Sequence, residues 1–164
     1  MLLIDDNRSG DITISEFSNE MLESSVQQTD GEKVSVLVVD VETTGLSFDN
    51  DKIIQLACRP VLFDKTTGTV TRLMNCRMFY NDPGFEISPE ITELTGVTNE
   101  QVAGSQIDWG WVAKVITKVD FVVAHNVRFD RHFIKKHMIE ADVAMPDTIW
   151  ACSMDQVNWR KNCT

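Results

Sequence analysis

The chain has 164 residues, of which 43% are hydrophobic and 24% charged, and its formal net charge is −10. This composition suits one soluble domain, and no stretch approaches the roughly 18 apolar residues that a membrane span needs. So acidic a chain is not expected to bind nucleic acid through a broad basic surface. The four cysteines form no C-x-x-C pair, which favours a reducing, cytoplasmic setting with no membrane partner.

The first 31 residues hold seven acids and one arginine, and Asp5 to Phe17 resembles the calcium-binding loop of the EF-hand family. The resemblance implies a Ca²⁺ site whose ligands are Asp5, Asn7, Ser9, the Asp11 carbonyl and Glu16. The four residues before the loop are too few to form its incoming helix, so we expect weak binding. An acidic turn without an ion is the alternative. The polar stretch that follows, ending at Gly31, is expected to be a linker.

Residues 34–41 form an apolar stretch that predicts a buried strand. Two acids, Asp40 and Glu42, stand at its end and are separated by Val41. Side chains alternate along a strand, so Asp40 and Glu42 are expected on one face and Val41 on the other. Paired carboxylates at the end of a buried strand are costly without a cation between them. Oxygen ligands of this kind suit Mg²⁺ or Mn²⁺.

Further elements are indicated along the chain. Two more strands are expected at about 52–62 and 70–79, and the spacing of apolar residues predicts a helix at about 107–118. A strand at 120–124 is expected to lead into a helix at about 127–140, with Asn126 as its N-cap and Asp130 in its first turn. A third carboxylate from this helix start would complete the metal site.

The two motifs V-D-V-E-T-T-G-L (residues 39–46) and A-H-N-x-x-F-D (residues 124–130) resemble the first two motifs of the DEDD exonuclease superfamily. The likeness is greatest to its branch with the proofreading subunit of bacterial DNA polymerase III and ribonuclease T. The connector Ile91–Thr98, the strand Ile53–Ala57 and Pro146–Thr148 follow in the family's order. The resemblance implies an α/β, ribonuclease-H-like fold with a mixed sheet flanked by helices. The expected domains are a front segment, 1–31, and an exonuclease domain, 32–164.

By the same resemblance, the chain would release nucleotides from the 3′ end of DNA or RNA by hydrolysis with two Mg²⁺ or Mn²⁺ ions. The catalytic residues and metal ligands would be Asp40, Glu42 and Asp130. The residues expected to contact substrate are Thr43, Thr44, Gly45, Leu46, His125, Asn126 and Phe129, with Leu46 as a wedge against the terminal base.

The family's third motif, H-x-x-x-x-D on a late helix, supplies a general base and a fourth carboxylate. A literal match occurs at His137–Asp142, but an α-helix would place Asp142 about 18 Å beyond Asp130, too far to share a metal. The exonuclease fold is therefore expected to lack its last helix, to be inactive as this fragment, and to expose apolar surface near Val36, Val38 and 149–157.

Other interpretations remain open. The chain could be a catalytically silent module that binds nucleic acid or a partner, with calcium ordering its front end. A pure calcium-binding protein is disfavoured, because the exonuclease pattern covers most of the chain. A second copy of the chain and a polymerase are both compatible partners. Lys135, Lys136, Arg128 and Arg131 are expected to form a solvated helix face, with a nucleic-acid backbone as the alternative contact.

Overall fold

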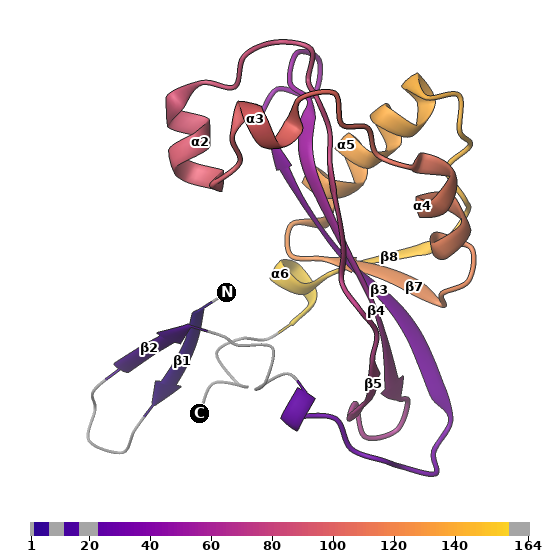
Figure 1. Cartoon of the computed structure of the whole chain (residues 1–164). Coiled ribbons are helices and arrows are strands. Elements are labelled where there is room, and N and C mark those ends of the chain that lie inside the picture. Colours follow the sequence, from indigo (N-terminus) through magenta and orange to yellow (C-terminus); the bar gives the residue numbers. More distant parts are fainter. Residues whose placement is uncertain (1, 7–11, 17–22, 158–164) are drawn as a thin grey trace.

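The computed structural model describes residues 2–6, 12–16 and 23–157. Its centre is a six-stranded mixed sheet in the order β5-β4-β3-β7-β8, with β6 also paired to β4 (Figure 1). β3 is antiparallel to β4 and parallel to β7, which is parallel to β8. The strands are β3 (Lys33–Thr43), β4 (Ile53–Asp64), β5 (Val70–Leu73), β6 (Arg77–Tyr80), β7 (Phe121–Ala124) and β8 (Ile149–Cys152). This architecture confirms the predicted α/β class.

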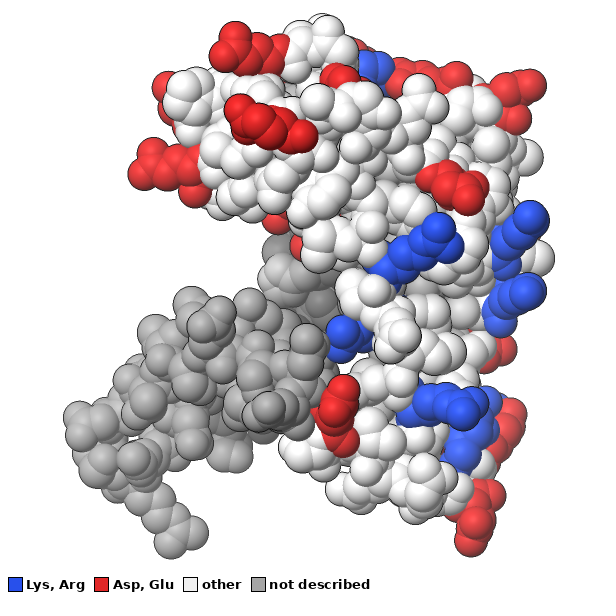
Figure 2. Space-filling model, in the orientation of Figure 1, with Lys and Arg blue, Asp and Glu red and all other residues white. Residues whose placement is uncertain are grey.

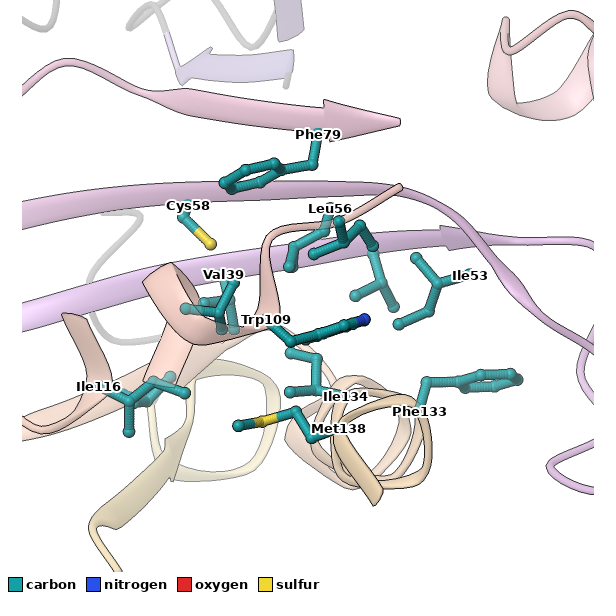
Figure 3. Packing of buried hydrophobic residues seen from close by; sticks show 14 of the residues in the cluster. Val39, Ile53, Leu56, Cys58, Phe79, Trp109, Ile116, Phe133, Ile134 and Met138 are labelled. Carbon is teal, nitrogen blue, oxygen red and sulfur yellow. The ribbon is translucent and has the colours of Figure 1, made fainter. Parts of the chain in front are cut away.

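One face of the sheet carries the main core. Leu37, Val39 and Val41 alternate along β3 and are buried against α4 (Trp109–Ile116) and α5 (Val127–Glu140). Figure 3 shows Trp109, Ile134 and Met138 pointing from the two helices toward Val39 and Leu56 of the sheet. Asp108 begins α4 by accepting a hydrogen bond from the Trp111 backbone, so this helix starts two residues later than predicted.

The opposite face of the sheet is apolar and partly uncovered. Val34, Val36 and Val38 of β3 line a groove of about 470 Å³ together with Phe121 and Val123 of β7. Val38 is 40% and Ile149 70% exposed, as expected, whereas Val36 is only 2% exposed, contrary to the expectation. Because side chains two residues apart share a face, Asp40 and Glu42 continue the row of Val34, Val36 and Val38.

Two short helices between β6 and α4 were not predicted as helices. They are α2 (Pro89–Thr95) and α3 (Asn99–Val102). Ser88 caps α2, Gly96 ends it in the left-handed conformation (φ 73°), and Thr98 forms a capping box with Gln101. Acidic side chains gather over α2 and α3, while most Lys and Arg side chains on this face lie below them (Figure 2).

The expected strand at 70–79 is two strands, β5 and β6, separated at residues 74–76. β4 contains Pro60, whose carbonyl accepts a hydrogen bond from Met74 on this side of the strand. An ordinary residue would also donate its N–H on that side, but proline has none, so the ladder is interrupted there.

At the front of the chain, β1 (Leu2–Asp6) and β2 (Ile12–Glu16) form an antiparallel pair, which the sequence did not predict. The expected linker does not run free of the domain, because the Gln27 amide donates to the Val70 carbonyl and the Thr29 hydroxyl donates to Asp64. The division between residues 31 and 32 stays a prediction. Among the described helices, none is long and apolar enough to cross a membrane.

Candidate active site

Three acidic residues lie near the C-terminal end of β3, beyond its pairing with β7. Asp40 and Glu42 lie on the open face of β3, and Asp130 lies in the first turn of α5. The carboxylate of Asp130 is 4% exposed, and its Oδ1 accepts a hydrogen bond from the Val41 backbone amide at 3.1 Å. Since Val41 separates Asp40 from Glu42, this hydrogen bond brings Asp130 to the segment of β3 that carries both acids.

The three carboxylates hold a proton more tightly than isolated acids do. Burial raises the pKa of Asp40, an effect that nearby His125 partly offsets, and burial together with Asp40 raises the pKa of Glu42. Burial and the negative charge of Asp40 raise the pKa of Asp130 from 3.8 to about 6. Mutual repulsion of this kind requires that the groups lie close together, and a cation would relieve it.

This donor set fits a divalent metal ion in its chemistry. Carboxylate oxygens on a rigid strand and a helix start are ligands of the kind that Mg²⁺ and Mn²⁺ prefer. Nevertheless, as placed within residues 2–6, 12–16 and 23–157, no group of three or more His, Cys, Asp or Glu side chains could hold a metal ion. Metal binding at these three acids therefore stays a prediction.

The turn expected to contact substrate follows Glu42 directly. Thr43 is buried, and its hydroxyl donates to the Gly45 carbonyl at 2.6 Å. The Thr44 hydroxyl donates to Asp51 at 2.8 Å and accepts from the Lys52 backbone amide. Leu46 extends from this turn and is 81% exposed. The two threonines therefore shape the turn, and Leu46 is the side chain that it presents to solvent.

The residues predicted at the second motif have three different environments. His125 follows β7, two residues beyond the Val38–Val123 pair, which places it beside Asp40; its Nδ1 lies 3.2 Å from the Ser153 hydroxyl. Ser153 is the first residue of α6 (Ser153–Gln156). Asn126 is the N-cap residue of α5, as predicted, although its side chain makes no capping hydrogen bond. The Phe129 ring packs against the rings of Phe48 and Phe133.

His137 is a structural residue. It is 5% exposed, its Nε2 accepts from the Ile53 amide at 3.1 Å, and its Nδ1 lies 3.0 Å from the Phe133 carbonyl. These partners require a neutral ring with the proton on Nδ1, and burial lowers its pKa. Asp142 lies beyond the end of α5. His137 thus ties α5 to β4, in agreement with its exclusion from the third motif.

Three residues near the site were missed by the sequence interpretation. Neither Asp51 nor Phe48 was assigned a role at the site. Lys136 was expected on a solvated helix face, yet its ammonium group donates to the carbonyls of Asp49 and Asp51. Backbone carbonyls carry no sequence signal, so this contact could not be predicted, whereas the exposed Lys135 agrees with the solvated face.

The predicted calcium loop lies mostly outside the described residues. Asn7, Ser9 and Asp11 are not described, whereas Asp5 and Glu16 belong to β1 and β2. In the strand pair, Asp5 is opposite Thr13 and Glu16 is opposite Leu2. The alternating Leu2, Ile4, Ile12 and Ile14 account for a strand pair. Calcium binding by this segment stays a prediction.

A sequence model of the RNase_T exonuclease family matches residues 37–159, which include every residue predicted at the carboxylate site. The chain belongs to this exonuclease family.

Curated relatives agree. The domain is 33% identical over 118 residues to the 3′-5′ exonuclease DinG of Bacillus subtilis, a match covering 70% of this chain and 12% of DinG. It is 34% identical over 110 residues to a PolC-type DNA polymerase III of Clostridium perfringens, covering 63% of this chain and 7% of the polymerase. The chain thus spans only a small part of these relatives.

Solved structures share the fold. Product-bound exonuclease I superposes with a TM-score of 0.57 at 18% identity, covering 76% of this chain and 31% of that one. The zinc-bound complex of Escherichia coli exonuclease I with single-stranded DNA gives 0.56 at 18% identity, covering 74% and 28%. These neighbours confirm the predicted ribonuclease-H-like exonuclease fold.

Proposed function

We propose that this exonuclease domain binds the single-stranded 3′ end of DNA and removes its terminal nucleotide by hydrolysis that depends on Mg²⁺ or Mn²⁺. The observation that carries the proposal is the hydrogen bond from the Val41 amide to Asp130, which joins the third carboxylate to Asp40 and Glu42. The single-stranded DNA in the exonuclease I complex and the polymerase among the relatives support DNA as the substrate.

In this proposal each group of residues has a separate task. Asp40, Glu42 and Asp130 would hold the metal ions, which when bound supply an activated water and stabilise the departing oxygen. The turn at Thr43–Leu46 would receive the terminal nucleotide, with Leu46 against its base. His125, beside Asp40, is placed to contact the terminal phosphate or sugar.

The acidic character of the domain is compatible with this substrate. The net charge is −10, and none of the described salt bridges involves Asp40, Glu42 or Asp130. A polyanion therefore meets negative charge at the site unless cations are bound there first. We accordingly propose that metal binding precedes tight binding of the nucleic acid.

The test is release of nucleotides from a 3′-labelled single strand by the chain in Mn²⁺. Asp40→Ala should abolish release without unfolding the domain, because it removes one of the repelling carboxylates, while Asp30→Ala in the linker should have no effect. Release that survives Asp40→Ala or chelation of the metal would contradict the proposal. If the chain degraded an RNA strand in preference to the matched DNA strand, RNA would replace DNA as the proposed substrate.

We further propose that turnover by residues 1–164 is low, since His137 is engaged with Ile53 and Phe133 and cannot act as the base at the carboxylates. A general base contributes about 10²–10⁴-fold. A longer form that supplies a third motif should be faster; equal rates would show that the chain already holds a base.

A catalytically silent binding module is the second candidate, favoured because no group of three or more His, Cys, Asp or Glu among the described residues could hold a metal ion as placed. It predicts that the chain binds a 3′ end in Mn²⁺ and releases nothing, in either the short or the longer form. Both candidates are compatible with a calcium-binding front segment and a cytoplasmic setting. Both are also compatible with a second copy of the chain or a replication protein as partner. The complex of exonuclease I with a segment of SSB offers a precedent for such a partner.

A further inference from the structure

The loop that joins β3 to β4, residues 44–52, is held together from inside by one carboxylate. Asp51 Oδ1 accepts from the Thr44 hydroxyl, and Oδ2 accepts from the Ser47 backbone amide, both at 2.8 Å. The Asp51 amide in turn donates to the Ser47 carbonyl at 2.9 Å. These bonds close a ring around the two residues between Thr44 and Ser47, which are Gly45 and Leu46.

Gly45 is required by close approach to this carboxylate. A Cβ atom at position 45 would lie 2.5 Å from Asp51 Oδ2 and 2.8 Å from its Cγ. Such a distance is far below van der Waals contact, so a side chain at Gly45 would displace Asp51. The glycine of the T-T-G-L motif therefore serves the contact with Asp51 and, through it, the direction in which Leu46 extends.

The same loop is fastened from outside to α5. Lys136 Nζ donates to the carbonyls of Asp49 and Asp51 at 3.2 and 3.1 Å. The Phe48 ring stacks on His132, with ring centres 3.9 Å apart, and lies 5.3 Å from the Phe133 ring. Since α5 also carries Asp130, the loop and the third carboxylate are held by the same helix.

This arrangement holds a large apolar side chain in water on a rigid support. Leu46 is 81% exposed although its neighbours on both sides are fixed by hydrogen bonds. An exposed apolar side chain in a fixed position gains free energy only when another apolar surface, such as the plane of a base, covers it. The distance between Leu46 and the carboxylates is then a fixed property of the domain.

We propose that Asp51 and Lys136 are positioning residues that fix Leu46 relative to the carboxylates, so that the terminal base of a single-stranded DNA 3′ end binds in one register. This inference rests on the proposed function. Neither residue touches the substrate; each acts through the loop. Loosening the loop should weaken terminal-base binding about tenfold, because a displaced Leu46 would be covered less completely by the base. The metal ligands should be unaffected.

The experiment uses the 164-residue chain and an oligonucleotide with 2-aminopurine as its 3′-terminal base, titrated in Ca²⁺ to suppress cleavage. Lys136→Met keeps the aliphatic stem but removes the donor, and Lys135→Met, one residue earlier on the exposed surface, is the matched control. We measure the dissociation constant, the change in 2-aminopurine fluorescence, Mn²⁺ affinity and the melting temperature. Lys136→Met should weaken binding about tenfold and reduce the fluorescence change, with Mn²⁺ affinity equal to the control.

A second pair of variants guards against loss of folding. Asp51→Asn keeps the side-chain shape but presents an N–H group to one of its two donors, and Asp49→Asn removes a charge from the same loop without altering these bonds. Combining Leu46→Ala with Lys136→Met should add nothing to Leu46→Ala alone, because both act on one contact. Additive losses would overturn the proposal.

The outcomes separate the two levels of inference. If the unchanged chain does not bind the 3′ end, the proposed function fails and the positioning role fails with it. If the chain binds but Lys136→Met and Asp51→Asn match their controls, only the positioning role is overturned. A parallel loss of Mn²⁺ affinity or folding in both variants would show a structural role alone and would also overturn it.

Discussion

Replacing Asp130 with asparagine should make the metal-free domain more stable at neutral pH, although Asp130 is buried in the site. Burial and neighbouring carboxylates raise its pKa from 3.8 to about 6. Because the pKa of Asp130 is higher in the folded state than in the unfolded state, folding favours the protonated carboxyl group. This contribution to the free energy of unfolding is fully present below pH 3.8 and is lost as pH rises through 6, where Asp130 ionises in the folded state. At about 1.4 kcal/mol for each tenfold change in proton affinity, the ionised group costs roughly 3 kcal/mol, or about 1–3 after allowing for solvent screening.

Asparagine tests this charge alone, since its side-chain oxygen still accepts the hydrogen bond from the Val41 amide. In EDTA at pH 7.5, the variant should melt higher by about 2–4 °C for each kcal/mol gained, and the gain should shrink toward pH 4. Asp147→Asn, an exposed carboxylate, should change nothing. In Mn²⁺ the order should reverse, because the unchanged chain binds the ion better. Equal or lower stability of Asp130→Asn in EDTA at pH 7.5 would refute the reasoning.

Two further predictions concern residues outside the carboxylate site. His137→Phe should lower the free energy of unfolding by about 1–3 kcal/mol by leaving the Ile53 amide without an acceptor. Since the pKa of His137 in the folded state lies below 6.5, the substitution should also remove the loss of stability that His137 causes as pH falls below 6.5. Urea unfolding at pH 7.5 and at pH 5 measures both effects. An unchanged free energy of unfolding at pH 7.5 would contradict the structural role of His137. In the front segment, Glu16→Gln should abolish weak calcium binding in titration calorimetry. Identical heats for the two chains would leave only an acidic turn.

The sequence predicted the elements that position the carboxylates because their patterns are local. Alternation along residues 38–42 places Asp40 and Glu42 opposite the buried Val39 and Val41, and the same alternation holds in the structure. The helix at 127–140 has the expected bounds, with Asp130 in its first turn. Asn126 is the N-cap residue as predicted, but its side chain makes no capping hydrogen bond, because a propensity states a preference and not a hydrogen bond.

Contacts between distant parts of the chain were not predictable in this way. His137 pairs with the amide of Ile53, and Lys136 with the carbonyls of Asp49 and Asp51, which lie more than 80 residues earlier. Any residue type could supply those backbone groups. The short helices α2 and α3 were missed for a different reason, since their cap signals at Ser88 and Thr98 lie in segments too short for helical periodicity.

The contacts that fix α5 also hold Asp130 near Asp40 and Glu42 against their mutual repulsion. Asp130 would move away from Asp40 and Glu42 if α5 were free, because burial and repulsion both disfavour its ionised form. The helix is nevertheless fixed at several points to β4 and its preceding loop, through Lys136, His137 and the Lys52–Glu140 ion pair. These contacts do not involve the carboxylates, so they persist whether or not a cation is present. Protons and divalent cations must therefore compete for a site whose geometry is imposed from outside, and metal affinity should fall as pH drops below about 6, where Asp130 becomes protonated.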